Sequence, residues 1–369
     1  MTQLYIGLMS GTSLDGVDIA IVDFNQPKPH LISSHCLNYP DRLLQNIKRL
    51  CRNTSISFDD FGQLDAQLGE FYGQSIIQCL TKANVHARDI VAIGSHGQTV
   101  QHSPSTEPAY TVQIGDPNRI AEVTGISVVA DFRRRDIAAG GQGAPLAPAF
   151  HQALFQNSHD KLAVINIGGI ANLTFLSTDI ATPIIGFDCG PGNTLMDQWC
   201  QLHFNCAFDN SGLLAGSGTV NHSLLNSMLT DPYFTSPYPK TTGPEHFNIT
   251  WLTAHLTKHP ATNQDTLSTL CELTAASIYA GLSQLPAVNK ALICGGGWHN
   301  DQLIRRLNTL LNCPVESTEA HGVHPDWVEA VAFAWLAQQT MQGKPGNIPS
   351  VTGAKKSVVL GAIYQGIPS

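Results

Sequence analysis

The sequence predicts an α/β protein of two domains. At 369 residues the chain exceeds the roughly 250 to 300 residues at which one hydrophobic core stops growing. Two segments, 4–24 and 162–175, each have the pattern of a strand, a glycine turn and a second strand. We therefore expect two similar halves, each opening on a hairpin, with a cleft between them.

The elements of the first half alternate between β-rich and helical patterns. Residues 4–9 and 17–24 are apolar, β-rich runs around the first glycine turn. Segments 40–52 and 58–82 then carry apolar positions at helical spacing. The short apolar strand 90–94 delivers the polar run 95–99 to its carboxyl end. Open α/β sheets bind ligands at such ends, so we expect residues 95–99 to face the cleft.

The second half repeats this alternation. After the hairpin at 162–175, an apolar strand at 184–187 leads to Asp188. The pattern then predicts a helix at 267–285, a strand at 291–294 and a helix at 301–311. A last apolar helix is predicted at 328–339, with Glu329 near its start.

Composition restricts the class of protein. With 43% hydrophobic and 13% charged residues, the chain is typical of a globular protein. A formal charge of −8, from 20 basic and 28 acidic residues, disfavours a nucleic-acid partner. The chain opens without a positively charged leader and has no apolar run of bilayer length, so we expect no membrane partner and a cytoplasmic location. The nine cysteines form no CxxC pair and are expected to be reduced and mostly buried.

The loop 11–18 has the composition of a phosphate site. Its glycines expose backbone N–H groups, and its two hydroxyls add donors for phosphate oxygens. Asp15 and Asp18 would suit a hydrated Mg²⁺. The alternative is that they only satisfy N–H groups of the turn, and the neighbouring Gly-Thr-Ser favours the phosphate site over it. The loop contains no GxxxxGK[ST] sequence, so it is not a P-loop.

A second glycine-acid loop follows the strand at 184–187. Asp188 ends the strand before Cys-Gly-Pro-Gly, a placement that exposes a carboxylate and favours a general base over a cap. Asn193 could cap a helix or contact a ligand. Cys189 has no histidine partner nearby in sequence, which disfavours a catalytic thiol.

Two further segments carry candidate ligand contacts. Gly295 to Gly297 precede a helix N-terminus, where anions and close backbone approach are favoured, and a purine or ribose could lie there. The run Arg133 to Arg135 is either solvated surface or a cationic patch for a carboxylate or phosphate. The glycine-rich segment 138–143 that follows it is a candidate hinge.

These segments together resemble the anhydro-N-acetylmuramic acid kinases, members of the sugar kinase, Hsp70 and actin superfamily. The resemblance runs nearly end to end and rests on these blocks: MSGTSLDGVD at 9–18, SHGQT at 95–99, QIGDP at 113–117, DFR at 131–133, GGQGAPL at 140–146, NIGGIAN at 166–172, FDCGPGN at 187–193, CGGG at 294–297 and EAVAFAW at 329–335. Two departures are Cys189 where the family usually has Thr, and PYPKTTG at 237–243 in place of the common PPKSTG.

The resemblance implies two actin-like (ribonuclease H-like) domains with mixed sheets flanked by helices and an active site in the interdomain cleft. It places residues 1–130 and about 346–369 in the first domain, and 131–345 in the second. The implied ATP-binding residues are Gly11, Thr12, Ser13, Leu14, Asp15, Gly16, Val17, Asp18, Gly168, Gly169, Gly295, Gly296, Gly297 and Asn300. The implied sugar contacts are Thr99, Arg133, Asp188 and Glu329, with Asp188 catalytic and Asp15 and Asp18 as Mg²⁺ ligands.

The implied activity is the ATP-dependent opening of 1,6-anhydro-N-acetylmuramic acid to N-acetylmuramic acid 6-phosphate, in the recycling of peptidoglycan amino sugars. Because O6 is an ether oxygen in this sugar, the base must activate water rather than a hydroxyl. Two other functions remain open: a kinase of an ordinary sugar hydroxyl, and a nucleotide-operated binding module. No interface signature is visible, and the general frequency of twofold assemblies favours a homodimer.

Overall fold

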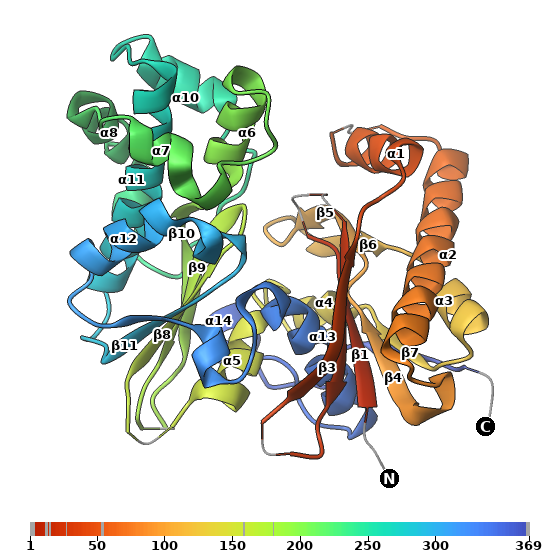
Figure 1. Ribbon diagram of the computed structural model, residues 1–369. Helices are drawn as coiled ribbons and strands as arrows, with labels where there is room; N and C mark the ends of the chain where they lie inside the picture. The colour runs from red at the N-terminus through yellow and green to blue at the C-terminus, as the bar shows by residue number, and fades with distance from the viewer. Residues whose placement is uncertain are drawn as a thin grey trace. The chain divides into compact units, whose positions relative to one another are not determined.

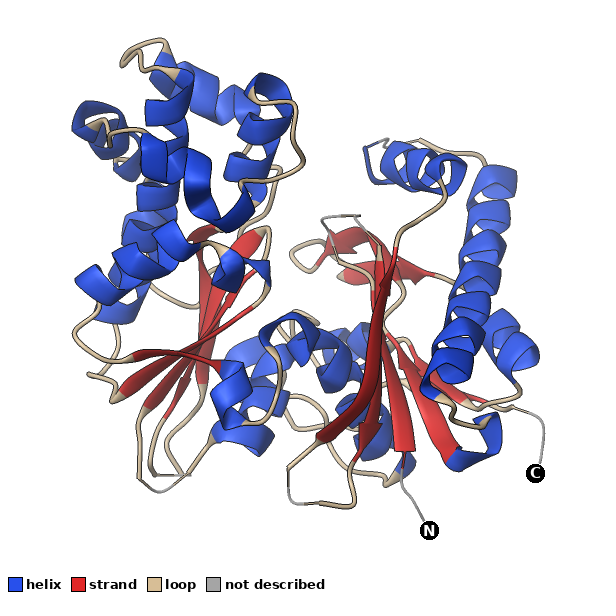
Figure 2. Cartoon of the chain, viewed as in Figure 1, coloured by secondary structure: helices blue, strands red, loops and turns tan. Residues whose placement is uncertain are grey.

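The chain folds into two compact units. A computed structural model describes residues 4–11, 14, 16–26, 28–52, 55–157, 159–179 and 181–366. The first unit is Met1–Phe150 with Trp327–Ser369, and the second is His151–Asp326. Each unit contains a mixed β-sheet flanked by helices, which confirms the predicted α/β class (Figures 1 and 2).

The first unit is built on a six-stranded sheet of order β3-β2-β1-β4-β7-β13, with a separate β5–β6 hairpin. Its strands are β1 (Leu4–Met9), β2 (Val17–Asp23), β3 (His30–Leu37), β4 (Ile90–Ser95), β5 (Gln98–Ser103), β6 (Tyr110–Ile114), β7 (Val128–Ala130) and β13 (Ala362–Tyr364). Its helices are α1 (Asp41–Arg52), α2 (Phe58–Ala83), α3 (Pro117–Thr124), α4 (Phe132–Ala138), α13 (Val328–Met341) and α14 (Pro349–Thr352), and α5 (Ala147–Phe155) contains the boundary with the second unit.

The second unit has a five-stranded sheet of order β10-β9-β8-β11-β12. Its strands are β8 (Leu162–Ile167), β9 (Ile170–Leu176), β10 (Ile185–Pro191), β11 (Lys290–Cys294) and β12 (Val315–Ser317). Its helices are α6 (Thr194–His203), α7 (Leu213–Ser217), α8 (His222–Leu229), α9 (Pro232–Thr235), α10 (Ile249–Leu256), α11 (Asn263–Ser283) and α12 (Asp301–Leu310). Helix α11 is buried over most of its length and packs against β9, β10 and the helices α6, α7, α8 and α12.

The two sheets have the same topology, which confirms the expectation of two similar halves. In the first unit, β3, β2 and β1 form an antiparallel meander, and β4 and β7 then run parallel to β1. In the second unit, β10, β9 and β8 form the meander, and β11 and β12 run parallel to β8. The first sheet adds only β13, which pairs antiparallel to β7.

The boundaries between the units fall at 150/151 and 326/327, not at the expected 130/131 and 345/346. The reason is α13, which packs on β1 and β4 of the first sheet. Two strand glycines allow this contact. A Cβ atom on Gly7 would lie 1.7 Å from the Ala330 carbonyl oxygen, and one on Gly94 would lie 2.0 Å from the Phe333 carbonyl oxygen. Because the helix backbone rests directly on these strands, Glu329 belongs to the first unit.

A buried carboxylate fastens α4 to the C-terminal segment of the same unit. Asp136 Oδ1 accepts hydrogen bonds from Asn347 Nδ2 and Thr352 Oγ1, both at 2.7 Å. Its Oδ2 accepts from the Gly143 N–H at 2.8 Å. The glycine-rich segment 138–143, the candidate hinge, is also held by backbone hydrogen bonds from Gly141 N to Asp136 O and from Gln142 N to Thr352 O. These contacts place Arg133 in the first unit as well.

Because His151 is buried, we expect the free energy of unfolding of the protein to fall at acidic pH. Its Nδ1 lies 2.9 Å from Thr174 Oγ1, while Nε2 has no partner among the described residues. Burial lowers the pKa of His151 to about 3, whereas an unfolded histidine titrates near 6.5. Between these values the unfolded chain binds the extra proton, so the free energy of unfolding falls as the pH falls, by about 1.4 kcal/mol per pH unit.

We expect His151→Phe to flatten this dependence by nearly that amount per pH unit between about pH 4 and pH 5.5, where the unfolded histidine is protonated and the folded one is not. Urea unfolding of both proteins across this range measures the two slopes. An unchanged slope in the variant would show that His151 is not held neutral.

Within the described part of the chain, no helix is long and apolar enough to cross a membrane.

Candidate functional site

The predicted loops of the second unit lie at one edge of its sheet. β8 and β11 are parallel, so the turn at Gly168 and Gly169 and the loop starting at Gly295 both follow carboxyl ends at that edge. Asp188 lies at the same level of the sheet as these strand ends. It pairs with Asn172 of β9, Asn172 pairs with Asn166 of β8, and Asn166 pairs with Cys294 of β11. Asp188 therefore lies in line with the strand positions that precede these loops.

The loop Gly295 to Gly297 requires glycine because its backbone packs on β8. Gly295 has φ of +78°, and a Cβ there would lie 2.4 Å from Asn166 Oδ1. A Cβ on Gly297 would lie 2.3 Å from Ile167 Cγ2, while Gly296 faces open space except for Asn193 Nδ2 at 3.8 Å. The loop is thus shaped by close packing in the unit itself.

Asn300 and Asn193 both make structural contacts. The Asn300 side-chain oxygen accepts from the Leu303 N–H at 3.0 Å and caps α12. Asn193 stands at the start of α6 but makes no side-chain cap. Its Nδ2 instead donates to the Ile167 carbonyl at 3.1 Å, and its N–H donates to the Gly168 carbonyl at 2.8 Å. Asn193 therefore holds the β8–β9 turn against the loop that follows β10.

Asp188 is held by hydrogen bonds at almost every polar atom. Its Oδ2 accepts from Thr241 Oγ1 at 2.7 Å and from the Thr242 N–H at 3.0 Å. Burial raises the pKa of the Asp188 carboxyl, the two hydrogen bonds oppose that rise, and the charge of Glu245 adds to it. A carboxylate with a raised pKa in a hydrogen-bonded site fits the predicted general base.

The segment that surrounds Asp188 includes residues 231–242, which the sequence alone did not connect with this aspartate. Tyr233 Oη donates to the Asp188 carbonyl at 2.7 Å, and the Asp188 N–H donates to the Lys240 carbonyl at 3.1 Å. Lys240 Nζ in turn donates to the Tyr233 carbonyl at 2.9 Å. Asp231 anchors this segment by accepting from the Tyr233 N–H. The one sequence signal for this segment is the PYPKTTG motif at 237–243, and no local pattern links it to Asp188.

Cys189 is a buried packing residue. Its side chain is 1% exposed, and burial with the nearby Asp188 charge raises the pKa of the thiol to about 12. A Cβ on Gly281 of α11 would lie 2.9 Å from the Cys189 sulfur. The thiol therefore fills a tight space against α11 and is protonated at neutral pH, in agreement with the expectation that it is not a nucleophile.

The predicted phosphate loop of the first unit is described only in part, because Thr12, Ser13 and Asp15 lie outside the described residues. Leu14 adopts φ of +57°, and its N–H donates to the Gly11 carbonyl at 3.4 Å. A Cβ on Gly16 would lie 2.6 Å from the Leu37 carbonyl oxygen. Val17 begins β2, and Asp18 pairs with Met9 across the β1–β2 hairpin.

His96 links this loop to Arg133 within the first unit. Its Nδ1 lies 3.2 Å from the Ser10 carbonyl, and its Nε2 accepts from Arg133 Nε at 3.1 Å and Nη2 at 2.9 Å. Burial and the Arg133 charge lower the pKa of His96 to about 3. The imidazole is therefore neutral, with its proton on Nδ1 and its lone pair on Nε2 facing the guanidinium.

The arginine run separates into two environments. Arg134 and Arg135 are exposed, and Arg134 pairs with Asp131 at 3.5 Å. Arg133 is half-buried, and its Nη1 donates to the Gly143 carbonyl at 2.8 Å. Burial lowers the pKa of Arg133 to about 10, with the charges of Glu329 and Asp136 opposing the shift. The solvated-surface alternative holds for Arg134 and Arg135, while Arg133 turns inward.

The remaining two predicted sugar contacts also belong to the first unit. Burial raises the pKa of Glu329, and Arg133 opposes that shift, so the two side chains interact electrostatically. Thr99 lies on β5, where its Oγ1 accepts from Gln113 Nε2 at 3.1 Å. The Gln113 side-chain oxygen is buried without a partner among the described residues.

The described residues offer few protein groups that could bind the predicted Mg²⁺. The described residues contain no cluster of three or more His, Cys, Asp or Glu side chains that could hold a metal. Mg²⁺ in phosphate-transfer sites is usually bound by one or two carboxylates plus phosphates and water. Asp18, the described carboxylate at the end of the predicted phosphate loop, is compatible with this way of binding.

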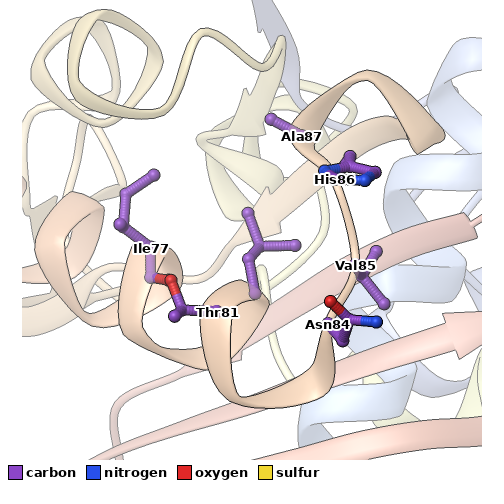
Figure 3. Close-up of a pocket in the computed structure, with 7 residues that line it drawn as sticks. Ile77, Thr81, Asn84, Val85, His86 and Ala87 are labelled. Carbon is purple, nitrogen blue, oxygen red and sulfur yellow. The ribbon is translucent and has the colours of Figure 1, made fainter.

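A surface hollow elsewhere in the first unit lies apart from the candidate functional site. It lies at the end of α2, where Asn84 adopts the left-handed conformation and caps the helix (Figure 3). Ile77, Thr81, Val85, His86 and Ala87 line it. None of the predicted site residues contributes to it, and its lining has no acidic side chain.

Comparison with known proteins decides the class. Residues 3–366 match the profile of the family described as anhydro-N-acetylmuramic acid kinase. The chain belongs to the anhydro-N-acetylmuramic acid kinase family. It is 49% identical over 366 residues to the enzyme of that name from Coxiella burnetii (strain RSA 493 / Nine Mile phase I), an alignment that covers 99% of this chain and 98% of that protein.

A second relative gives the same result. The anhydro-N-acetylmuramic acid kinase of Shewanella amazonensis (strain ATCC BAA-1098 / SB2B) is 48% identical over 364 residues, with 98% of both chains covered. Membership of this kinase family makes the chain a phosphotransferase and supports the use of ATP. The duplicated sheet topology agrees with the two actin-like domains that the resemblance implied.

Proposed function

We propose that this kinase opens 1,6-anhydro-N-acetylmuramic acid with water and phosphorylates its O6, producing N-acetylmuramic acid 6-phosphate and ADP. Family membership across nearly the whole chain supports the substrate class. The observation that carries the hydrolytic step is Asp188, a fixed carboxylate with a raised pKa in line with the loop edge of its sheet. We also propose that the reaction serves cytoplasmic recycling of peptidoglycan amino sugars.

The proposed reaction balances as one coupled displacement. Asp188 takes a proton from water while the water oxygen bonds to C1. The C1–O6 bond breaks, and its electron pair stays on O6. O6 then bonds to the γ-phosphorus as the bond from phosphorus to the β–γ bridging oxygen breaks, and that electron pair leaves with ADP. Asp188 releases its proton to solvent, so one water is consumed for each ATP.

The roles of the binding residues follow from their chemistry. Arg133 is the proposed partner of the sugar's lactyl carboxylate, because its guanidinium retains N–H groups beyond those used by His96 and Gly143. Thr99 and Glu329 are proposed to contact the sugar with it. The proposed nucleotide contacts are residues 11–18, Gly168, Gly169, Gly295, Gly296, Gly297 and Asn300.

Asp15 and Asp18 are the proposed Mg²⁺ ligands. When bound, Mg²⁺ would neutralise charge on the β- and γ-phosphates. Asp18 is the described member of the pair, and it lies on β2 directly after the phosphate loop.

Mass spectrometry of the products tests the proposed function. The protein is incubated with the anhydro sugar, Mg²⁺ and ATP in ¹⁸O-labelled water and quenched early. We expect a sugar 6-phosphate whose mass exceeds that of the simple phosphoryl-transfer product by the mass of one labelled water. Unlabelled product kept in the same labelled water corrects for spontaneous exchange at C1.

Two results would overturn the proposal. Phosphorylation of an ordinary hexose without turnover of the anhydro sugar would indicate a kinase of a sugar hydroxyl. ATP hydrolysis that does not depend on any sugar would indicate a nucleotide-operated binding protein.

A further inference from the structure

We infer that Thr241 is a positioning residue, which fixes the Asp188 carboxylate so that Oδ1 is the oxygen that takes the proton from water. The inference rests on the proposed function, in which Asp188 is the base. It goes beyond that function by naming the reacting atom and the side chain that selects it.

Among the described residues, the hydrogen bonds of Asp188 leave one polar atom, Oδ1, without a donor. Its N–H donates to the Lys240 carbonyl at 3.1 Å, and its carbonyl accepts from Tyr233 Oη at 2.7 Å. Oδ2 accepts from both Thr241 and Thr242. None of the described residues donates to Oδ1, so Oδ1 keeps its lone pairs for a ligand.

Thr241 is the side chain that makes this selection. Thr242 uses its backbone N–H, which any residue except proline would supply. The Thr242 hydroxyl is buried without a partner among the described residues, so it does not contribute to the Asp188 contact. Thr241 uses its hydroxyl, and loss of that group would leave Oδ2 with one donor and the carboxylate free to rotate.

The segment that carries Thr241 is itself fixed. Lys240 Nζ donates to the Tyr233 carbonyl at 2.9 Å and lies 4.7 Å from the centre of the Tyr233 ring. Asp231 accepts from the Tyr233 N–H at 2.9 Å, from Trp251 Nε1 at 2.9 Å and from His246 Nε2 at 3.0 Å. Because these anchors do not involve the exposed Thr241 side chain, its replacement removes the contact to Asp188 without removing packing.

The test compares Thr241→Val with Thr241→Ser. We expect Thr241→Val to lower kcat by about tenfold or more, because a hydrogen bond to a charged group is lost. The same hydrogen bond lowers the pKa of Asp188. Its loss should therefore raise that pKa and move the acidic limb of the kcat/KM profile to higher pH. Thr241→Ser keeps a hydroxyl and should restore both the rate and the profile.

Thr253→Val is the matched control, because Thr253 is an exposed threonine on α10 whose hydroxyl bonds only to the Ile249 carbonyl among the described residues. It should behave as wild type. A wild-type rate and pH profile in Thr241→Val would overturn the inference, while absence of turnover of the anhydro sugar by the wild type would overturn the proposed function instead. Titration of the Asp188 carboxyl by ¹³C NMR, assigned with Asp188→Asn, measures the same pKa change without substrate.

Discussion

Asp188→Asn should abolish turnover while leaving nucleotide affinity unchanged. An amide cannot accept the proton of the attacking water, and general bases supply about 10²- to 10⁴-fold in rate. The fold around the residue should survive, because the Asn oxygen can take the place of Oδ2 opposite the Thr242 N–H and the Thr241 hydroxyl. Steady-state kinetics with the anhydro sugar give the rate, and calorimetry with a non-hydrolysable ATP analogue gives the affinity.

The matched control is Asp179→Asn, an exposed aspartate in a turn of the same unit. Its contact with the Ala181 N–H can be made by an amide oxygen, so the kinetics should match the wild type. More than about a tenth of the wild-type rate in Asp188→Asn would rule out the base role, given the usual contribution of such a group.

Gly7→Ala should destabilise the first unit by about 3 kcal/mol or more. The added Cβ would lie 1.7 Å from the Ala330 carbonyl oxygen and 2.7 Å from the Ala334 nitrogen. Both are backbone atoms of α13, so no side-chain rotation can relieve the overlap, and the helix must move off the sheet. Glu329, a proposed sugar contact, lies in the first turn of that helix, so we expect the KM for the sugar to rise as well. Urea unfolding measures the stability loss.

Gly62→Ala provides a control with the opposite sign. Gly62 lies within α2, and a Cβ there would meet no atom within 4 Å. Alanine is favoured over glycine in a helix interior by about 1 kcal/mol, so this variant should be stabilised. Equal changes in the free energy of unfolding of the two variants would show that the contact between α13 and β1 does not determine the stability of the first unit.

The sequence predicted the elements with strong periodicity. β1, β2, α2 and α11 were expected at nearly their observed bounds, because each buries a regular apolar pattern of sufficient length. The two edge strands of the first sheet were missed. β3 alternates between half-buried and exposed residues, and β13 has only three residues, so neither has a distinct apolar run.

The candidate site was predicted where chemistry was local in sequence. Asp188 and the glycine loops stand out because a carboxylate or glycine directly follows an apolar run in the sequence, although Asp188 itself lies within β10. The Thr241 contact was missed because it joins residues 53 positions apart. The contact of His96 with Arg133 was missed for the same reason, at a separation of 37. Such pairs depend on tertiary packing, which no local pattern encodes.

In the sequence, α13 and β13 follow the second unit, and this order affects how the chain folds while it is synthesised on the ribosome. All of His151–Asp326 is contiguous, so the second unit is complete as soon as that stretch has emerged. The first unit begins earlier, yet β1 and β4 lack their helix until residue 341 is translated, and β7 lacks its last neighbour until residue 364. Synthesis of the first unit therefore begins before that of the second unit and ends after it. Its apolar strands lack their packing helix while the second unit is synthesised.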